Sequence, residues 1–372
     1  MATNIRGLKS VKKNITALII NLNRSINMKK IIHLLLLPIL FSCNNNNAPD
    51  VSDIKIGLQT NRFEKDFFAI DTNHILPSLQ QLHKKYPSFL PDYLENILGL
   101  PPLNDTGRAT QEAIRKFISD YKPLKDSAAK IFSDMDPIRE DIVTGLKYVK
   151  HYFPKYQAPG KLITFIGPMD AYFEGSLGGY GDVITTDALA VGLQLHLGKN
   201  FTVYKSEMGQ ALYPAYISRR FSPDYIPVNC IKNIIDDMFP DQTTGKHLVI
   251  QMVEKGKRLY LLDKLAPFIP DSLKTGYTGN QLTGCYKNEG LIWNYFLTNG
   301  LLYSNDPGTI KNYIGESPNT PEFGDGAPGN IGLFTGWQIV KKYMDKNPVL
   351  TLDSLMKTDS KRIFEDSKYR PK

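Results

Sequence analysis

The chain has 372 residues and a formal net charge of +8, and it is 42% hydrophobic and 11% aromatic. This apolar and aromatic content excludes an intrinsically disordered chain. Residues 1–42 hold seven basic residues and no acidic one, so removing them lowers the net charge from +8 to about +1. Such a nearly neutral body excludes nucleic-acid binding driven by overall charge.

Segment 28–43, MKKIIHLLLLPILFSC, has the pattern of a bacterial lipoprotein signal. Two lysines precede an apolar run at 31–41, which is shorter than the ~20 residues that span a bilayer. The ending LFSC (40–43) resembles a lipobox. This resemblance implies cleavage before Cys43, a diacylglycerol on its sulfur and acylation of the new amino terminus, which together make a firm membrane anchor. The alternative is an unmodified cysteine beside an ordinary cleavage site.

The regions around this signal are interpreted from their composition. Because 28–42 is a complete signal peptide, residues 1–27 are interpreted as an upstream extension, with a long leader as the alternative. Residues 43–53 contain the polar run NNNNAPD and are predicted to be a flexible tether. With no internal repeat and no further boundary, 54–372 is predicted to be a single globular domain.

Periodicity predicts the elements of this domain. Weak alternation of apolar and polar residues over 54–68 predicts a first strand. Apolar residues at helical spacing then predict helices at 71–85, 93–98, 110–121, 124–132 and 137–153. The β-branched segment 161–166, KLITFI, is predicted to be a strand that forms a hairpin with 182–186, and 188–197 fits a strand or a helix.

The remainder is predicted to be helical, apart from a loop at 316–329 that is rich in proline and glycine. The predicted helices lie at 229–238, 245–265, 278–298, 330–344 and 351–364. In the helix at 330–344, Trp337, Ile339, Val340 and Tyr343 are expected to be buried in the core. Together these elements predict an α+β fold that is predominantly helical, with a small antiparallel sheet packed with helices.

Known catalytic motifs lack the spacing or context that their chemistry needs. An HExxH zinc site requires two histidines four residues apart on a helix, and none of the six histidines is so placed. A scattered zinc site would have to use His151, His196, His247 and acidic residues, although His196 and His247 are expected to be surface or satisfied core residues. Residues 324–329 spell GxGxxG, but no strand is predicted before them. We assign no catalytic, metal-binding or cofactor-binding residue.

Cys230 and Cys285 are the only cysteines after Cys43. They could pair in an oxidising periplasm. Two cysteines are not a disulfide framework, however, so buried free thiols remain an equal alternative.

Seven segments, in order along the chain, resemble the gliding-motility lipoprotein GldB family of the Bacteroidota. YISRRF and PGNIG…GWQIV are the most specific parts of the match. The segments are GPMDAYFEGSLGGYGD (167–182), TDALAVGLQLHLGKNF (186–201), YPAYISRRFSPDYI (213–226), GKRLYLLDKLAPFIPDSLKTGYT (256–278), NEGLIWNYFLTNGLLYSND (288–306), APGNIGLFTGWQIVKKYM (327–344) and SKYRPK (367–372). The resemblance implies an envelope lipoprotein, lipid-anchored at Cys43, with protein partners in the gliding motor and its linked secretion apparatus.

The C-terminal half is also distantly similar to zinc metallopeptidase-like domains. That similarity implies a degenerate zincin-like fold with a metal helix near 229–238 and a further ligand near Glu254. Residues 231–235 read IKNII where HExxH would be needed, so we expect a pseudo-peptidase without inherited hydrolysis.

Three functional hypotheses follow. The first is a non-catalytic envelope component that binds other proteins of the machinery. The others are a divergent periplasmic hydrolase, and a small-molecule or glycan-binding lipoprotein with loop 316–329 as a lid. Asn44 stands where an aspartate would favour retention in the inner membrane, and the asparagine run lacks the acidic residues of a surface-export signal. We therefore expect the protein to be anchored in the outer membrane, facing the periplasm.

Overall fold

The computed structural model describes residues 48–105, 107–170 and 181–372. Cys43, segments 1–27 and 28–42, and the first part of the predicted tether lie outside the described residues. Ala48–Lys372 belong to one compact unit. Val51, within the predicted tether, is buried, and its carbonyl oxygen accepts a hydrogen bond from the Ile54 amide at 3.1 Å. None of the described helices is long and apolar enough to cross a membrane.

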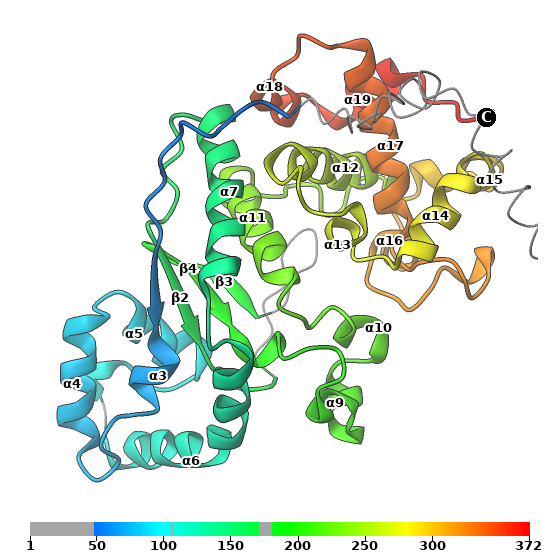
Figure 1. The fold of residues 1–372 in the computed structure, drawn as a ribbon. Coiled ribbons are helices and arrows are strands. Elements are labelled where there is room, and N and C mark those ends of the chain that lie inside the picture. Colours follow the sequence, from blue (N-terminus) through cyan, green and yellow to red (C-terminus); the bar gives the residue numbers. More distant parts are fainter. Residues whose placement is uncertain (1–47, 106, 171–180) are drawn as a thin grey trace, which may run out of the picture. The chain divides into compact units, whose positions relative to one another are not determined.

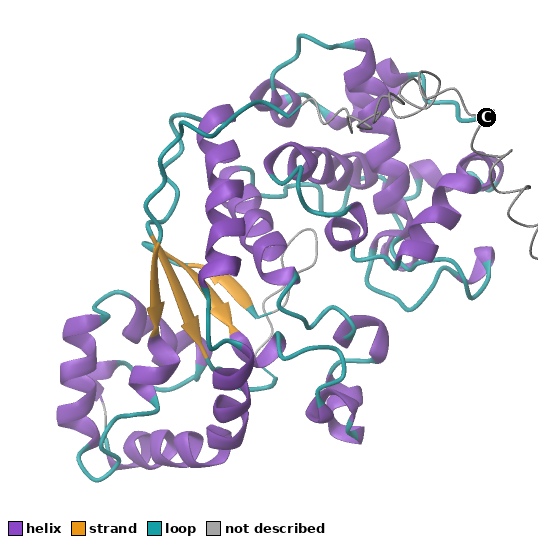
Figure 2. Ribbon diagram, in the orientation of Figure 1, coloured by secondary structure: helices purple, strands orange, loops and turns teal. Residues whose placement is uncertain are grey.

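A mixed four-stranded sheet lies in the described part of the chain (Figures 1 and 2). Its strands are β1 Gln59–Arg62, β2 Lys161–Phe165, β3 Asp182–Ile184 and β4 Ala188–Gly192. In the order β1-β2-β4-β3, β2 runs parallel to both neighbours, and only β3 and β4 are antiparallel. The predicted hairpin between the strands at 161–166 and 182–186 is therefore wrong, because β4 lies between them, and the sheet is mixed rather than antiparallel.

The sheet separates two hydrophobic cores, because successive side chains of a strand point to opposite faces. Ile163 and Phe165 of β2 enter a smaller core formed mainly by N-terminal helices. Leu162 of β2 and Val191 of β4 enter a larger core that extends through the C-terminal helices. Burial on both faces explains why β2 and β4 are apolar almost throughout.

The first half contains one helix that is not predicted, at Phe89–Asp92, and differs from prediction at two further places. The bounds of its helices are α3 Phe63–Phe67, α4 Ile75–Lys85, α5 Phe89–Asp92, a π-helical turn Tyr93–Ile97, α6 Arg108–Ile131 and α7 Asp136–Tyr152. The strand predicted over 54–68 ends at Arg62, because Phe63 and Phe67 are both buried at helical spacing. The helices predicted at 110–121 and 124–132 are one helix, α6.

Pro123 lies inside α6, where a proline costs about 3 kcal/mol. The helix nevertheless continues, because Ile114, Ile118, Leu124 and Ala128 keep one buried face on both sides of the proline. Packing of that face outweighs the missing hydrogen bond.

After β4, the regular elements of the described residues are all helices, joined by loops. This part of the chain contains α8 Thr202–Lys205, α9 Glu207–Leu212, α10 Ala215–Ser218, α11 Tyr225–Met238, α12 Leu248–Leu265, α13 Asp271–Thr275, α14 Gly279–Lys287, α15 Glu289–Thr298, α16 Pro307–Ile314, α17 Ile331–Lys346, α18 Leu352–Lys357 and α19 Ser360–Ser367. The predicted helix 278–298 is broken at Asn288 into α14 and α15. The predicted helix 351–364 is broken where Asp359 caps α19 by accepting from the Arg362 amide at 3.1 Å.

Helices α12 and α17 cross at the centre of the larger core (Figure 1). Trp337, Ile339, Val340 and Tyr343 of α17 are buried, as predicted. Gly336 makes the close approach possible, since a Cβ there would overlap the Met252 carbonyl oxygen of α12. The PGNIG…GWQIV segment is thus explained as a helix-packing element.

The predicted fold class, predominantly helical α+β with a small sheet packed with helices, is confirmed. The zincin-like relation of the C-terminal half stays a prediction.

Candidate functional site

The predicted loop 316–329 is held firmly at both ends. The Arg220 guanidinium donates two hydrogen bonds to the Glu316 carboxylate, at 3.1 and 2.8 Å. Thr320 donates through its hydroxyl to the Pro328 carbonyl oxygen at 2.8 Å. Gly329 packs so closely that a Cβ would overlap the Ser317 carbonyl oxygen. These contacts fix the base of the loop and leave its tip, with the 3₁₀ turn Pro321–Phe323, at the surface.

The YISRRF segment supplies one of these anchors. Arg219 donates to the Gly276 carbonyl oxygen at 2.7 Å, while the adjacent Arg220 binds Glu316. Two consecutive arginines therefore tie the end of α10 to the α13–α14 turn and to the start of loop 316–329. The bidentate contact of Arg220 with the Glu316 carboxylate uses the planar guanidinium fork, which lysine lacks.

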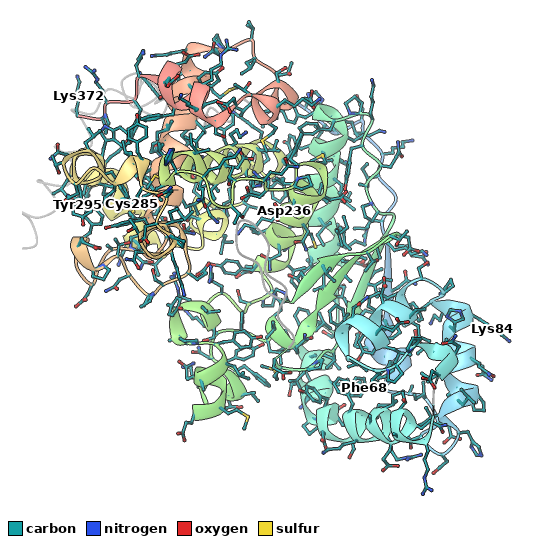
Figure 3. All side chains as sticks on the ribbon, turned by 180° about the vertical axis from the view of Figure 1, so that it is seen from behind. Phe68, Lys84, Asp236, Cys285, Tyr295 and Lys372 are labelled. Carbon is teal, nitrogen blue, oxygen red and sulfur yellow. The ribbon has the colours of Figure 1, made fainter. Side chains whose placement is uncertain are left out.

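Loop 316–329 forms one wall of a cavity of about 450 Å³. The other walls come from α14, α15 and the start of α17, the helical region in which Figure 3 labels Cys285 and Tyr295. The lining residues are Gln281, Gly284, Cys285, Asn288, Leu291, Ile292, Glu322, Phe323, Gly326, Ala327, Pro328 and Ile331. A cavity of this size, lined by both apolar and polar side chains, is suited to a ligand or to a side chain of another molecule.

Both cysteines of the body are buried and unpaired. Cys285 lines the cavity, and burial raises the pKa of its thiol to about 12. Cys230 lies on α11, and burial followed by the nearby Asp182 carboxylate raises the pKa of its thiol well above the usual value. Of the two alternatives in the sequence, the structure therefore has free thiols, and it keeps both in the protonated, unreactive form.

The segment that would correspond to a metallopeptidase metal helix packs into the hydrophobic core of this protein. Residues 231–235 lie on α11, where Ile231, Ile234 and Ile235 are fully buried in the larger core. The described residues contain no group of three or more His, Cys, Asp or Glu side chains that could hold a metal ion.

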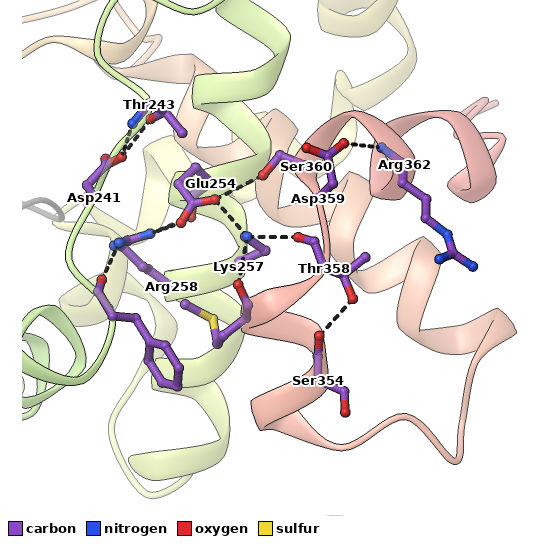
Figure 4. Close-up of polar contacts among 12 residues, drawn as sticks. Asp241, Thr243, Glu254, Lys257, Arg258, Ser354, Thr358, Asp359, Ser360 and Arg362 are labelled. Atoms are coloured by element: carbon purple, nitrogen blue, oxygen red, sulfur yellow. Dashed lines mark hydrogen bonds and ion pairs between the residues drawn. The ribbon is translucent and has the colours of Figure 1, made fainter.

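Glu254, the predicted further ligand position, takes part in a buried ion network (Figure 4). Its carboxylate pairs with Arg258, with Lys257 at 2.7 Å, and with the Ser360 hydroxyl at 2.9 Å. Lys257 also donates to the Met356 carbonyl oxygen at 3.0 Å. Both carboxylate oxygens are thus occupied, and they connect α12 to the α18–α19 region.

Burial by itself raises the pKa of Glu254, but the charges of Lys257 and Arg258 outweigh burial and hold that pKa below its usual value. The carboxylate is therefore ionised and committed to two cations. Its geometry suits a structural link between helices.

The histidines considered as scattered ligands are separated. His196 is buried, with Nε2 at 2.9 Å from Asp182 Oδ2 and Nδ1 at 3.2 Å from the Ser222 carbonyl oxygen. Asn229 of α11 also donates to Asp182, at 2.8 Å. His247 is exposed beside the ring of Tyr303, and His151 is exposed at the end of α7. His196 is thus the satisfied core residue and His247 the surface residue that the sequence predicted.

Sequence reasoning missed the cavity. The sequence pattern identifies loop 316–329 but predicts α14 and α15 as one helix. The opposite wall of the cavity lies at the break between these two helices. Asn288, at this break, donates through its side chain to the Gly284 carbonyl oxygen at 2.9 Å. An asparagine between the largely polar residues of α14 and the apolar run of α15 was the available signal.

Comparison with known proteins relates this structure to one family. The model of a lipoprotein family, described as gliding motility protein GldB, matches residues 44–371. The match begins directly after Cys43, includes every described helix and strand, and confirms the resemblance seen in the sequence. No curated protein and no solved structure matches the chain. The chain belongs to the gliding motility protein GldB family.

Proposed function

We propose that this protein is a non-catalytic component of the gliding machinery and its associated secretion apparatus, anchored in the cell envelope by lipid on Cys43. The observation that carries the proposal is the family match over 44–371, which starts at the residue after the predicted lipidation site. Gliding motility is a property of a multi-protein apparatus, so a member of this family is expected to act through protein contacts.

The lipid anchor gives this proposal its location. The lipobox LFSC and the polar residues after it favour the outer membrane, with the body facing the periplasm. Cys43→Ala is expected to move the protein from the membrane fraction to the soluble periplasmic fraction. Retention of Cys43→Ala in the membrane at the wild-type level would contradict anchoring at this residue.

The non-catalytic part of the proposal is supported by how the structure uses the peptidase-like positions. Glu254 is committed to Arg258, Lys257 and Ser360, and the corresponding part of α11 packs isoleucines into the core. Elemental analysis of the native purified protein is expected to find substoichiometric zinc. Stoichiometric zinc that is lost in Glu254→Gln would overturn this part of the proposal.

Partner binding is tested with the native lipidated protein. Mild crosslinking in intact cells, followed by affinity purification, is expected to recover gliding or secretion components with wild type and to lose them with Cys43→Ala. Recovery of the protein alone from wild-type cells would contradict the proposal.

A second candidate, a periplasmic ligand-binding lipoprotein, is favoured by one observation. The predicted lid, loop 316–329, does line a cavity of about 450 Å³. A small molecule or oligosaccharide that fills this cavity would stabilise the folded protein by a free energy of RT ln(1 + [L]/Kd). The melting temperature would rise accordingly. Absence of such a rise across neutral glycans and small periplasmic metabolites would exclude this candidate.

A further inference from the structure

We propose that the cavity beneath loop 316–329 binds a segment of a partner protein in which an apolar side chain lies next to a lysine or arginine. The inference rests on the proposed function, because it assigns the surface through which the protein would contact its partners. Three features carry it: a preformed frame, an apolar pocket with an exposed rim, and an acidic loop tip.

The frame is preformed. The Arg220–Glu316 contact and the Thr320–Pro328 hydrogen bond fix the two ends of the loop. At the tip, the Phe323 ring meets the Tyr295 ring edge-on, with centroids 5.1 Å apart. A binding surface that is already ordered loses little conformational entropy when a partner binds.

The pocket has an apolar floor, and its exposed rim combines Leu291 with the polar side chains of Asn288 and Glu322. Cys285, Ile292 and Ile331 are buried and form the floor, and Phe323 from the loop closes one side. Leu291 lines the same cavity, yet 60% of its surface is exposed. An exposed leucine at the rim of an apolar pocket provides area that an arriving apolar side chain would cover.

The loop tip is acidic. Loop 316–329 contains three acidic residues and no basic one, and Glu316 pairs with Arg220. Glu322 lines the cavity, and Asp325 is exposed one residue before the lining residue Gly326. None of the described lining residues is a lysine, arginine or histidine. One carboxylate in the lining and a second beside it, with no cation among the described lining residues, disfavour a phosphate or carboxylate ligand and favour a basic one.

The same charges favour a protein segment over a free small molecule. Asp325 is not part of the lining, so a ligand that uses both the pocket and Asp325 has to extend beyond the rim. An extended peptide does this readily, since neighbouring side chains reach the pocket and the loop tip at once. The apolar side chain would supply most of the affinity, and its basic neighbour would supply specificity.

The test uses the full lipidated protein in its own envelope. The photo-crosslinker p-benzoylphenylalanine is placed at Leu291 or, as a matched control, at Leu297, which lies on the same helix, is 50% exposed and does not line the cavity. Adducts are identified by mass spectrometry. The 291 probe is expected to capture one protein segment with an apolar residue adjacent to lysine or arginine, at a yield at least tenfold above that of the 297 probe.

Charge reversal then tests the acidic tip. Glu322→Lys combined with Asp325→Lys is expected to lower the yield at position 291 at least tenfold, with an unchanged circular dichroism spectrum. Replacing the partner's adjacent basic residue by glutamate should restore the yield. Equal capture at 291 and 297, indifference to charge reversal, or protection of the site by a glycan or small molecule would overturn the inference.

The inference and the proposed function can fail separately. If affinity purification recovers gliding components but the 291 probe captures nothing, only this surface is wrong. If the affinity purification is also empty, the proposed function fails as well.

Discussion

Single residues in this protein acquire their roles from partners that are distant in the sequence. Glu254 is bound by residues one turn away on α12 and by Ser360, more than a hundred positions later. His196 is fixed by Asp182 and by the Ser222 carbonyl oxygen. In a sequence, a glutamate or a histidine that binds a metal cannot be distinguished from one that links two helices. The packing around it decides between the two.

We expect Glu254→Gln to lower the free energy of unfolding by about 3–5 kcal/mol at neutral pH. The substitution leaves Lys257 and Arg258 buried beside a neutral group, which is the costly way to break a buried ion network. Urea unfolding followed by circular dichroism measures the change. Glu365→Gln is the matched control, because its pair with Lys361 is exposed and 3.9 Å apart, and we expect it to cost less than about 1 kcal/mol. Equal losses in both variants would contradict the structural role of Glu254.

The same residue predicts a pH dependence. The pKa of Glu254 is lower in the folded protein than its usual value of 4.5, so the unfolded chain binds more protons near and below that pH. The stabilisation is therefore complete above pH 4.5 and is lost as the pH falls through the folded-state pKa. Wild type should lose stability more steeply than Glu254→Gln below pH 4.5. Parallel stability curves for the two proteins between pH 3 and 7 would show that the ion network does not act in this way.

The cavity thiol predicts a chemical behaviour. Burial raises the pKa of Cys285 from the usual 9.0 to about 12, which lowers its thiolate fraction at pH 8 by roughly a thousandfold. We expect very slow labelling by Ellman's reagent in the folded protein and fast labelling in denaturant. Labelling of a Cys285→Ser variant separates the contribution of Cys230. Rapid reaction of the folded wild type, absent in Cys285→Ser, would mean that the thiol is exposed and activated.

At the scale of elements, the strong periodic helices were predictable and their ends were less so. Helix α7 and strand β2 follow the predicted bounds closely, because a single amphipathic or β-branched run defines each. Two long predicted helices are each split in two, at Asn288 and at Asp359, where side chains bond to local backbone groups. Conversely, α6 runs through Pro123 because its buried face continues. Helix caps, tertiary packing and hydrophobic periodicity therefore each determine where a helix ends at some positions of this chain.

The α12–α17 crossing gives a prediction about an element. We expect Gly336→Ala to destabilise the protein by about 1–3 kcal/mol or more, because its Cβ would overlap the Met252 carbonyl oxygen. Gly284→Ala is the control in the interior of another helix: nothing lies within 4 Å of its Cβ position, so helix propensity should raise stability by up to about 1 kcal/mol. Denaturant midpoints of the two variants should move in opposite directions. A tolerated Gly336→Ala would indicate a looser helix crossing.

For the molecule as a whole, the described residues of both hydrophobic cores lie between Leu58 and Tyr369. The first buried residue in the described range is Val51. We expect that the lipid proposed on Cys43 determines location and leaves folding unaffected.

This separation can be measured. The melting temperatures of wild type and Cys43→Ala, both purified in the same detergent, should agree within about 2 °C, since a change of 1 kcal/mol would shift a large domain by about 2–4 °C. A large drop in the variant would mean that the acylated terminus packs against the body. Loss of partner binding with an unchanged melting temperature is the expected combination.

The sequence alone determined the family, the predominance of helix and the burial of α17, because each depends on the pattern of residues along the chain. Only the tertiary structure decided the strand order, the commitment of Glu254 to two cations, the burial of both thiols, and the cavity between loop 316–329 and the α14–α15 break. Each of these joins segments far apart in the chain. A strand carries no local mark of its neighbour in the sheet, and a carboxylate carries none of its counter-ion, so such contacts exist only once the chain has packed.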